Sequence, residues 1–260
     1  MTRRRIAVAA ALVALATACV GGASAETIRS EDLLISFKTK LAPSALPRKG
    51  TAPINVSLGG SISTADGAPP PQLQTITFAI SRHGRLDYRG LPACHYHQIQ
   101  PASTAEALEA CPHSIVGEGT FGAHVLLPEQ SPFPSQGEAI AFNGIFHGDH
   151  VIYVQIYGRR PLPQSQVLVF HLGRTTGQYG VTMSAELPQV AANWGYVSGL
   201  SLKLGRTFTF KGKKRGFLSA GCPAPPGFPG ATFAMARATF GFDDGSTLPV
   251  STTGHCRPTD

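Results

Sequence analysis

The chain is dominated by short runs in which apolar and polar residues alternate. Between Leu73 and Ile80 the apolar positions favour one face of an extended backbone, which predicts a strand with one buried side. Similar runs recur along the chain, separated by turns rich in Gly, Pro, Asp and Asn. They predict strands over residues 33–37, 54–58, 73–80, 139–146, 151–157, 167–172, 179–187, 197–204, 206–210, 231–242 and 248–253.

Ten or more short strands at near-regular spacing predict an all-β fold, either a β-sandwich or a jelly-roll-like arrangement. The 29 Gly and 21 Pro residues fit a turn-rich fold of this kind. One short helix is expected near residues 103–111, because Ser103 and Glu106 form a capping box and Pro112 follows. We expect residues 26–260 to form a single sandwich-type domain, with residues 112–116 as the candidate place for a subdivision.

The strongest hairpin signal lies at residues 147–150, where Gly148-Asp149 suits a two-residue turn. His147 and His150 would then face each other across the strands, and Asp149 would be a third ligand in a metal-binding interpretation. Two histidines without further ligands hold metal weakly, so we favour an exposed turn and predict no metal site.

Residues 1–25 have the pattern of a secretory signal peptide. A basic start at residues 3–5 precedes an apolar stretch, and residues 23–25 provide an A-x-A cleavage site. We predict cleavage after Ala25 and a location outside the cytoplasm, either secreted or in the cell envelope. The alternative is a lipid anchor on Cys19, which follows a lipobox-like segment. No other stretch reaches the roughly 18 apolar residues of a membrane helix, so no membrane span is predicted.

Charge gives little evidence for a nucleic-acid partner. The chain has 22 basic and 15 acidic residues, and the signal peptide holds three of the basic ones, which leaves 19 − 15 = +4. Nucleic-acid-binding domains usually show a concentrated basic face. The densest basic cluster is the loop formed by Lys211, Lys213, Lys214 and Arg215. It predicts either an anion-binding loop, for an anionic envelope polymer, lipid head groups or nucleic-acid phosphate, or a solvated turn that blunts an edge strand.

Four cysteines remain after cleavage, which predicts two disulfides with three conceivable pairings. The local pairing, Cys94 with Cys111 and Cys222 with Cys256, is the simplest. The alternative is a zinc site at the first pair, because three nearby histidines also suit zinc. An exported chain favours oxidation of the thiols, and we therefore prefer the disulfides. The three histidines are His95, His97 and His113.

No arrangement of catalytic residues is recognisable in the sequence. It contains no G-x-S-x-G elbow, H-E-x-x-H, P-loop or dinucleotide-binding motif. Two carboxylate pairs suit a glycosidase in principle, Glu118 with Glu138 and Asp243 with Asp244. The second pair precedes Gly245 and is better explained as a turn. We predict no catalytic residue, no metal and no cofactor.

Trp194 is the single Trp of the chain, and a second aromatic residue, Tyr196, lies two positions after it. On a strand, residues two apart share one face, so these rings could form a stacking platform for a glycan. The alternative, which we favour, is burial in the core, because aromatic rings bury large apolar areas there.

Several stretches with turn and cysteine chemistry resemble a group of secreted, β-rich actinobacterial proteins without an assigned function. They are Gly90–Cys94, Cys111–Gly119, Ala141–Gly144 and Cys222–Phe228. The resemblance covers nearly the whole mature chain and implies export and an envelope setting, with no catalytic residues. The sequence thus predicts an exported, non-enzymatic envelope or extracellular protein with a binding or structural role. The alternative is a secreted hydrolase acting on carbohydrate.

Overall fold

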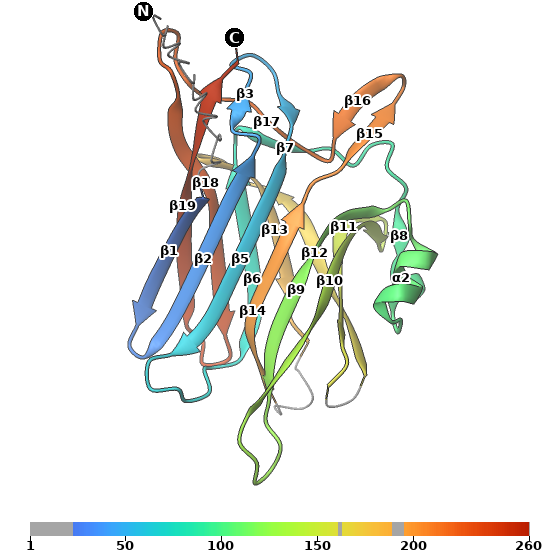
Figure 1. The fold of residues 1–260 in the computed structure, drawn as a ribbon, viewed down its shortest axis with the longest axis vertical. Helices are drawn as coiled ribbons and strands as arrows, with labels where there is room; N and C mark the ends of the chain where they lie inside the picture. Colours follow the sequence, from blue (N-terminus) through green and yellow to red (C-terminus); the bar gives the residue numbers. More distant parts are fainter. Residues whose placement is uncertain (1–22, 161–162, 189–194, 260) are drawn as a thin grey trace, which may run out of the picture.

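The computed structural model describes residues 23–160, 163–188 and 195–259, and these form an all-β fold built around one 14-stranded sheet (Figure 1). The all-β prediction is confirmed. Neighbouring strands of the sheet pair antiparallel, except that β3 and β8 pair in parallel with β19 and β10. In spatial order the strands are β1 (Ala23–Ser30), β2 (Leu33–Ala42), β5 (Asn55–Thr64), β14 (Gly195–Leu204), β9 (Ile115–Val125), β10 (Phe133–Phe146), β11 (Asp149–Gly158), β12 (Gln164–Arg174), β13 (Tyr179–Glu186), β6 (Leu73–Ser81), β18 (Ala231–Phe242), β19 (Thr247–Pro258) and β3 (Ala45–Leu46), with β8 (Cys94–His95) beside β10.

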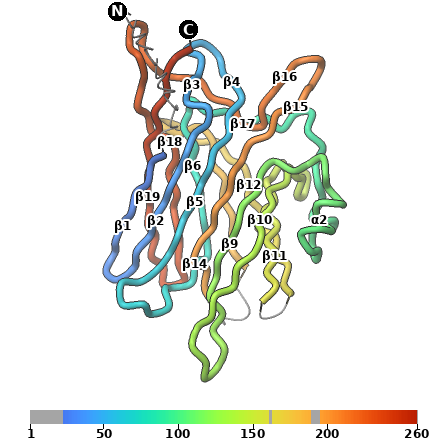
Figure 2. Tube along the Cα trace, viewed as in Figure 1, coloured from blue at the N-terminus to red at the C-terminus, as the bar shows by residue number. Residues whose placement is uncertain are grey.

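The sheet curls until its first strands, β1 and β2, pack against β19 near its other end. The two walls that face each other across the core therefore belong to one sheet, as the trace in Figure 2 shows. Inside the curl, Phe37 stacks on Phe78 with ring centroids 5.9 Å apart, and Phe78 contacts Phe170 at 6.0 Å. The inward positions of the alternating strands thus form the main core.

Two smaller sheets cover one end of the curl. The first contains β4 (Ala52–Pro53), β17 (Leu218–Ala220) and β7 (Gly84–Leu86). The second is a projecting hairpin of β15 (Thr207–Phe210) and β16 (Lys213–Gly216). We call this end of the molecule the hairpin end. The opposite end, where β1 turns into β2, β5 leads into β6 and β18 turns into β19, is called the open end (Figure 1).

A second apolar cluster lies on the outer face of the sheet, beneath α1 (Tyr96–Ile99) and α2 (Thr104–Ala110). The predicted capping box is confirmed, because Glu106 N–H donates to Ser103 Oγ at 3.3 Å and Ser103 N–H donates to the Glu106 carboxylate at 2.8 Å. The short helix α1 was not predicted. Side chains from both helices and from β10 and β11 form this cluster, including Ile99, Ala107, Phe142 and Tyr153.

Both predicted disulfides are present. Cys94 bonds to Cys111 and Cys222 bonds to Cys256, each pair with Cα atoms 5.7 Å apart. The first staples the two helices to the sheet, and the second joins the segment after β17 to β19. The zinc alternative at Cys94 and Cys111 is wrong, because it requires thiolates and these sulfurs are bonded to each other.

Two features differ from the sequence-based expectations. Strand β9 was not predicted, and it joins β14 to β10, so strands from both sides of residues 112–116 belong to the same sheet. The hairpin turn lies one residue earlier than predicted. Phe146 pairs with Asp149, so His147 and Gly148 form the loop, with φ angles of 50° and 93°.

The predicted signal segment lies outside the described residues except for residues 23–25. These three residues belong to β1 and pair with residues 38–40 of β2. Among the described residues, no helix is long and apolar enough to cross a membrane.

Candidate functional site

An apolar cavity of about 150 Å³ lies inside the curled sheet, toward the open end. Its walls come from both sides of the curl: Phe37 and Leu202 lie on β2 and β14, and Phe78 lies on β6. The lining is almost entirely aliphatic, aromatic or glycine, and the described part of it contains no carboxylate and no histidine. The cavity therefore offers shape and apolar contact rather than acid–base chemistry.

One part of the cavity lining lies where β11 ends and β12 begins. Arg160 and Gln164 line it there, and both are exposed. Ser135 Oγ donates to the Arg160 carbonyl at 2.7 Å, which fixes the backbone at this rim. Apolar lining residues near the open end are only partly buried, and a ligand would cover them further. They include Leu73, Phe121, Val125, Leu187 and Val197.

Glycine leaves part of this space unfilled. Gly60 lies opposite Phe37 in the β2–β5 pair, so it faces inward. A Cβ atom added at Gly60 would lie 3.6 Å from the Ser36 carbonyl and 3.8 Å from Phe240 Cζ, which are ordinary contact distances. The backbone there would accept a side chain, and the missing side chain keeps the cavity open.

A second hollow, of about 400 Å³, lies on the outer face of the sheet at β13, β18 and β19. Arg237 lies over the Tyr179 ring at 5.0 Å, and the Tyr179 hydroxyl donates to Ser251 Oγ at 3.4 Å. This hollow is more polar and more open to solvent than the interior cavity. We regard the interior cavity as the candidate site because it is enclosed and because apolar walls make burial of a ligand favourable.

The predicted anion-binding loop forms the tip of the β15–β16 hairpin. Lys211 and Gly212 make the turn, with φ angles of 51° and 71°, and Lys211, Lys213 and Lys214 are exposed. Arg215 is half-buried, and its guanidinium donates to Asp87 Oδ2 at 2.8 Å. Among the described residues, no carboxylate pairs with the three lysines. The three lysines are therefore the available charges of this loop, while Arg215 anchors it.

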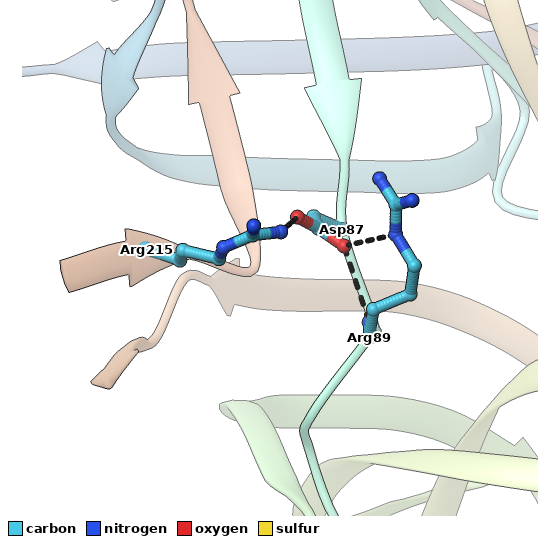
Figure 3. A network of polar contacts seen from close by, with 3 residues as sticks. All are labelled: Asp87, Arg89 and Arg215. Atoms are coloured by element: carbon cyan, nitrogen blue, oxygen red, sulfur yellow. Dashed lines mark hydrogen bonds and ion pairs between the residues drawn. The ribbon is translucent and has the colours of Figure 1, made fainter. Parts of the chain in front are cut away.

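Asp87 is the centre of this anchor (Figure 3). Its Oδ1 accepts from Arg89 N–H at 3.1 Å and from Arg89 Nε at 3.3 Å. Burial by itself would raise the pKa of Asp87, but the hydrogen bonds from the Arg89 backbone and from the Arg215 and Arg89 side chains hold it below 3.8. The Phe210 ring packs onto Gly90, where a Cβ atom would overlap it. Both strands of the hairpin are therefore held against the segment 87–90, β16 through Arg215 and β15 through Phe210.

Of the two residues predicted to stack on a glycan, Trp194 lies outside the described residues and Tyr196 lies within them. Tyr196 lies on β14, opposite His124 of β9, and the two rings stack with centroids 5.0 Å apart. Both side chains are on the outer face of the sheet, since Ala123 and Val125 on either side of His124 line the interior cavity. The platform stays a prediction.

The histidines of the β10–β11 hairpin do not face each other as predicted. His150 pairs with Ile145 and stacks on Tyr88 at 3.7 Å, whereas His147 lies in the turn and packs edge-on against Phe146 at 4.2 Å. Within the described part of the chain, no three His, Cys, Asp or Glu residues are grouped as a metal site.

The two carboxylate pairs both lie away from the cavity. Glu118 pairs with Ile140, and Glu138 pairs with Thr120, so the two glutamates are diagonal neighbours on the outer face. Asp243 and Asp244 cap the β18–β19 turn, where Asp243 accepts from Gln72 N–H at 2.9 Å and Asp244 accepts from Ser246 N–H at 2.8 Å. Hydrogen bonds from Ser246 lower the pKa of Asp244.

Other shifted pKa values also belong to structural contacts outside the cavity. Burial raises the pKa of Tyr153 to about 12, and its hydroxyl donates to the Ile145 carbonyl at 2.7 Å beneath the helices. Burial, with the nearby Arg82 charge, lowers the pKa of His83. Hydrogen bonds from Ser103 lower the pKa of Glu106 at the start of α2.

Comparison of the chain with protein-family models, with curated proteins and with solved structures finds no match. The resemblance to secreted actinobacterial proteins therefore stays a prediction. The interior cavity was not predicted from the sequence. Small residues at inward strand positions, such as Gly60 and Ala123, are its signal, but they point to a cavity only when the partner strands are known.

Proposed function

We propose that this protein is exported and acts in the cell envelope or outside the cell as a non-enzymatic binding protein, holding an apolar ligand inside its curled sheet. The interior cavity is the observation that carries this proposal. The signal-peptide pattern and the two disulfides support the location, because disulfides persist in oxidising compartments.

The size and chemistry of the cavity define the ligand class. Apolar cavities of about this volume stay dry and bind small apolar molecules such as benzene. A small ring or a segment of one acyl chain therefore fits. With almost no polar groups along the walls, affinity depends on the apolar area removed from water, at about 25 cal/mol per Å².

The exposed rim suits the polar end of such a ligand. Arg160 and Gln164 line the cavity and are exposed, so an amphiphile can place its chain inside and its head group beside them. Binding of this kind selects for chain length more strongly than for head group, because the enclosed contacts are apolar.

The hydrolase alternative has no comparable support. A glycosidase needs two carboxylates flanking a bond, and the described cavity lining contains none. Glu118 and Glu138 lie on the outer face of the sheet, away from the cavity.

A chain-length series tests the proposal. The protein is loaded with the small fluorescent apolar probe naphthalene, which is then displaced by straight-chain fatty acids from hexanoate to hexadecanoate. Each methylene buried contributes about 0.8 kcal/mol, so we expect affinity to rise about fourfold per methylene and to level off when the cavity is full. Absence of probe binding, or an affinity independent of chain length, would contradict the proposal. The mass of the exported protein tests cleavage after Ala25 separately.

A further inference from the structure

Charged side chains are separated along the long axis of the molecule, between the open end and the hairpin end. The open end carries acidic turn residues, among them Asp66 of the β5–β6 connection and the pair Asp243 and Asp244. The hairpin end carries a set of exposed basic residues that are far apart in the chain but lie in neighbouring connections. They include Lys49, Arg85, Arg89, Lys211, Lys213 and Lys214.

Acidic residues do little to neutralise the hairpin end. Asp87 is already engaged by Arg215 and Arg89, and Asp149 is the carboxylate of the nearby β10–β11 hairpin. The β15–β16 hairpin projects from the body of the molecule (Figure 1), and the three lysines at its tip are exposed. A projecting cluster of positive charge attracts a negatively charged surface and steers the molecule's approach to it.

The same end carries an exposed aromatic side chain. Phe228 is 59% exposed, the largest fraction among the exposed large apolar side chains of the described residues. It lies in the exposed segment 225–229 between β17 and β18, and its carbonyl accepts from Arg48 Nη2 at 2.7 Å. Figure 1 shows this connection at one side of the hairpin end and the β15–β16 hairpin at the other. An exposed apolar side chain and cations presented at the same end are the combination that the interface of a lipid bilayer favours.

We propose that the hairpin end binds an anionic lipid surface, with Lys211, Lys213 and Lys214 supplying the attraction and Phe228 entering the interface. A soluble anionic polymer would use the lysines equally well but would gain nothing from Phe228. A bilayer uses both, because each Lys or Arg near an anionic surface contributes about 1 kcal/mol and an apolar side chain adds a second, independent contact.

The start of the described chain lies at the hairpin end, which agrees with a molecule whose hairpin end faces the bilayer. Ala23 pairs with Lys40 at the end of β1 that lies toward the hairpin end. Cys19, the residue of the alternative lipid anchor, comes four positions before Ala23 in the sequence. An anchor there would tether the same end of the molecule that the basic residues bring to the bilayer.

The test measures binding to vesicles of phosphatidylcholine alone and of equimolar phosphatidylcholine and phosphatidylglycerol. Protein carrying Cys19→Ser is used, so that an acyl anchor cannot account for the result. We expect binding to the anionic vesicles only, weakening as salt is added. The double variant K213T/K214T should bind about 25-fold more weakly, from about fivefold per charge.

Two control variants show whether the position of the lysines and the Phe228 ring matter for vesicle binding. The variant R29T/R159T removes the same charge from the open end and should change vesicle binding less than about twofold. F228S should weaken binding to anionic vesicles and leave binding to soluble polyphosphate unchanged.

Several outcomes would overturn the lipid proposal. Equal losses for the two double variants would do so, as would the absence of vesicle binding. If F228S has no effect and polyphosphate competes completely, the partner is a soluble polymer and the lipid proposal is wrong. Displacement of the cavity probe is measured in parallel, so either proposal can fail alone.

Discussion

Thr39 and Thr252 are separated by 213 positions in the chain, yet Thr39 Oγ1 donates to Thr252 Oγ1 at 2.8 Å. Thr39 lies on β2 and Thr252 on β19, near the two ends of the curled sheet, and both side chains are buried. Thr252 Oγ1 also donates to the Ala236 carbonyl at 3.4 Å. This pair of hydroxyl groups therefore satisfies its own polar atoms while it joins the two ends that enclose the core.

Replacing both of these threonines should cost less stability than the sum of the two single replacements. Thr39→Val leaves the Thr252 hydroxyl short of a partner in the core, and we expect a loss of about 1–2 kcal/mol in the free energy of unfolding. The double variant T39V/T252V removes both polar groups while keeping their shape, so its loss should be smaller than the sum of the single losses. Urea denaturation of the four proteins in a double-mutant cycle measures the coupling. Additive losses would contradict the interpretation.

Filling the cavity should stabilise the protein and abolish ligand binding. Gly60→Val places a side chain into the cavity and removes a glycine from a strand, which is worth about 0.5–1 kcal/mol of stability in itself. Gly59→Val is the matched control: the backbone of Gly59 also borders the cavity, but strand alternation directs an added side chain outward, with nothing within 4 Å of its Cβ atom. Both variants should unfold at higher urea, but only G60V should lose naphthalene binding. Retained binding in G60V would place the ligand elsewhere.

Much of the fold could be predicted because strand alternation and cysteine count are local properties of the sequence. Strand β9 was missed because Gly117, Gly119 and Gly122 weaken its β signal. In the structure, a Cβ atom at Gly119 would overlap the Ser201 carbonyl of β14. The glycine allows two strands to approach closely, and no local pattern shows which strand that is.

The candidate site was harder to predict, for a related reason. The basic loop is contiguous in sequence and was found, but its anchor Asp87 lies 128 positions before Arg215. The cavity depends on which strands face each other across the curl, and that is set by the register of strands such as β5 and β14. Charge separation between the two ends likewise appears only once strand directions are known.

Gly119→Ala tests the close approach of β9 and β14. The added methyl group has no room against the Ser201 carbonyl, so the strands must separate. Overpacking of this kind typically costs about 1–3 kcal/mol, and we expect a loss in that range by urea denaturation. Gly59→Ala serves as the control, because Gly59 also lies in a strand and nothing lies within 4 Å of an added Cβ atom there. An unchanged stability in G119A would contradict the steric role of this glycine.

The anchor of the basic hairpin should respond to acid. The pKa of Asp87 is lowered in the folded state, so its charge stabilises the protein at pH values above 3.8, and this contribution disappears as pH falls through the lowered pKa. We expect Asp87→Asn to lose about 1 kcal/mol near neutral pH, because the carboxylate is partly exposed and hydrogen-bonded to charged groups. The difference from wild type should shrink below pH 3.8. Glu129→Gln, which removes an exposed carboxylate at the open end, should show no such dependence. A difference that persists in acid would mean that Asp87 acts through packing rather than charge.

The two disulfides should stabilise different parts of the protein. Cys94 and Cys111 are 17 positions apart and join the helices to the outer face of β10, so C94A/C111A should cost about 3 kcal/mol and loosen the outer cluster first. Hydrogen exchange should then rise in α2, whose Cys111 N–H bonds the Ala107 carbonyl at 3.1 Å, before it rises in the sheet. C222A/C256A should instead raise exchange in β19 and leave α2 protected, because its bond lies at the far side of the curl. Equal loss of protection everywhere in both variants would show that the helical cover and the sheet unfold as one unit.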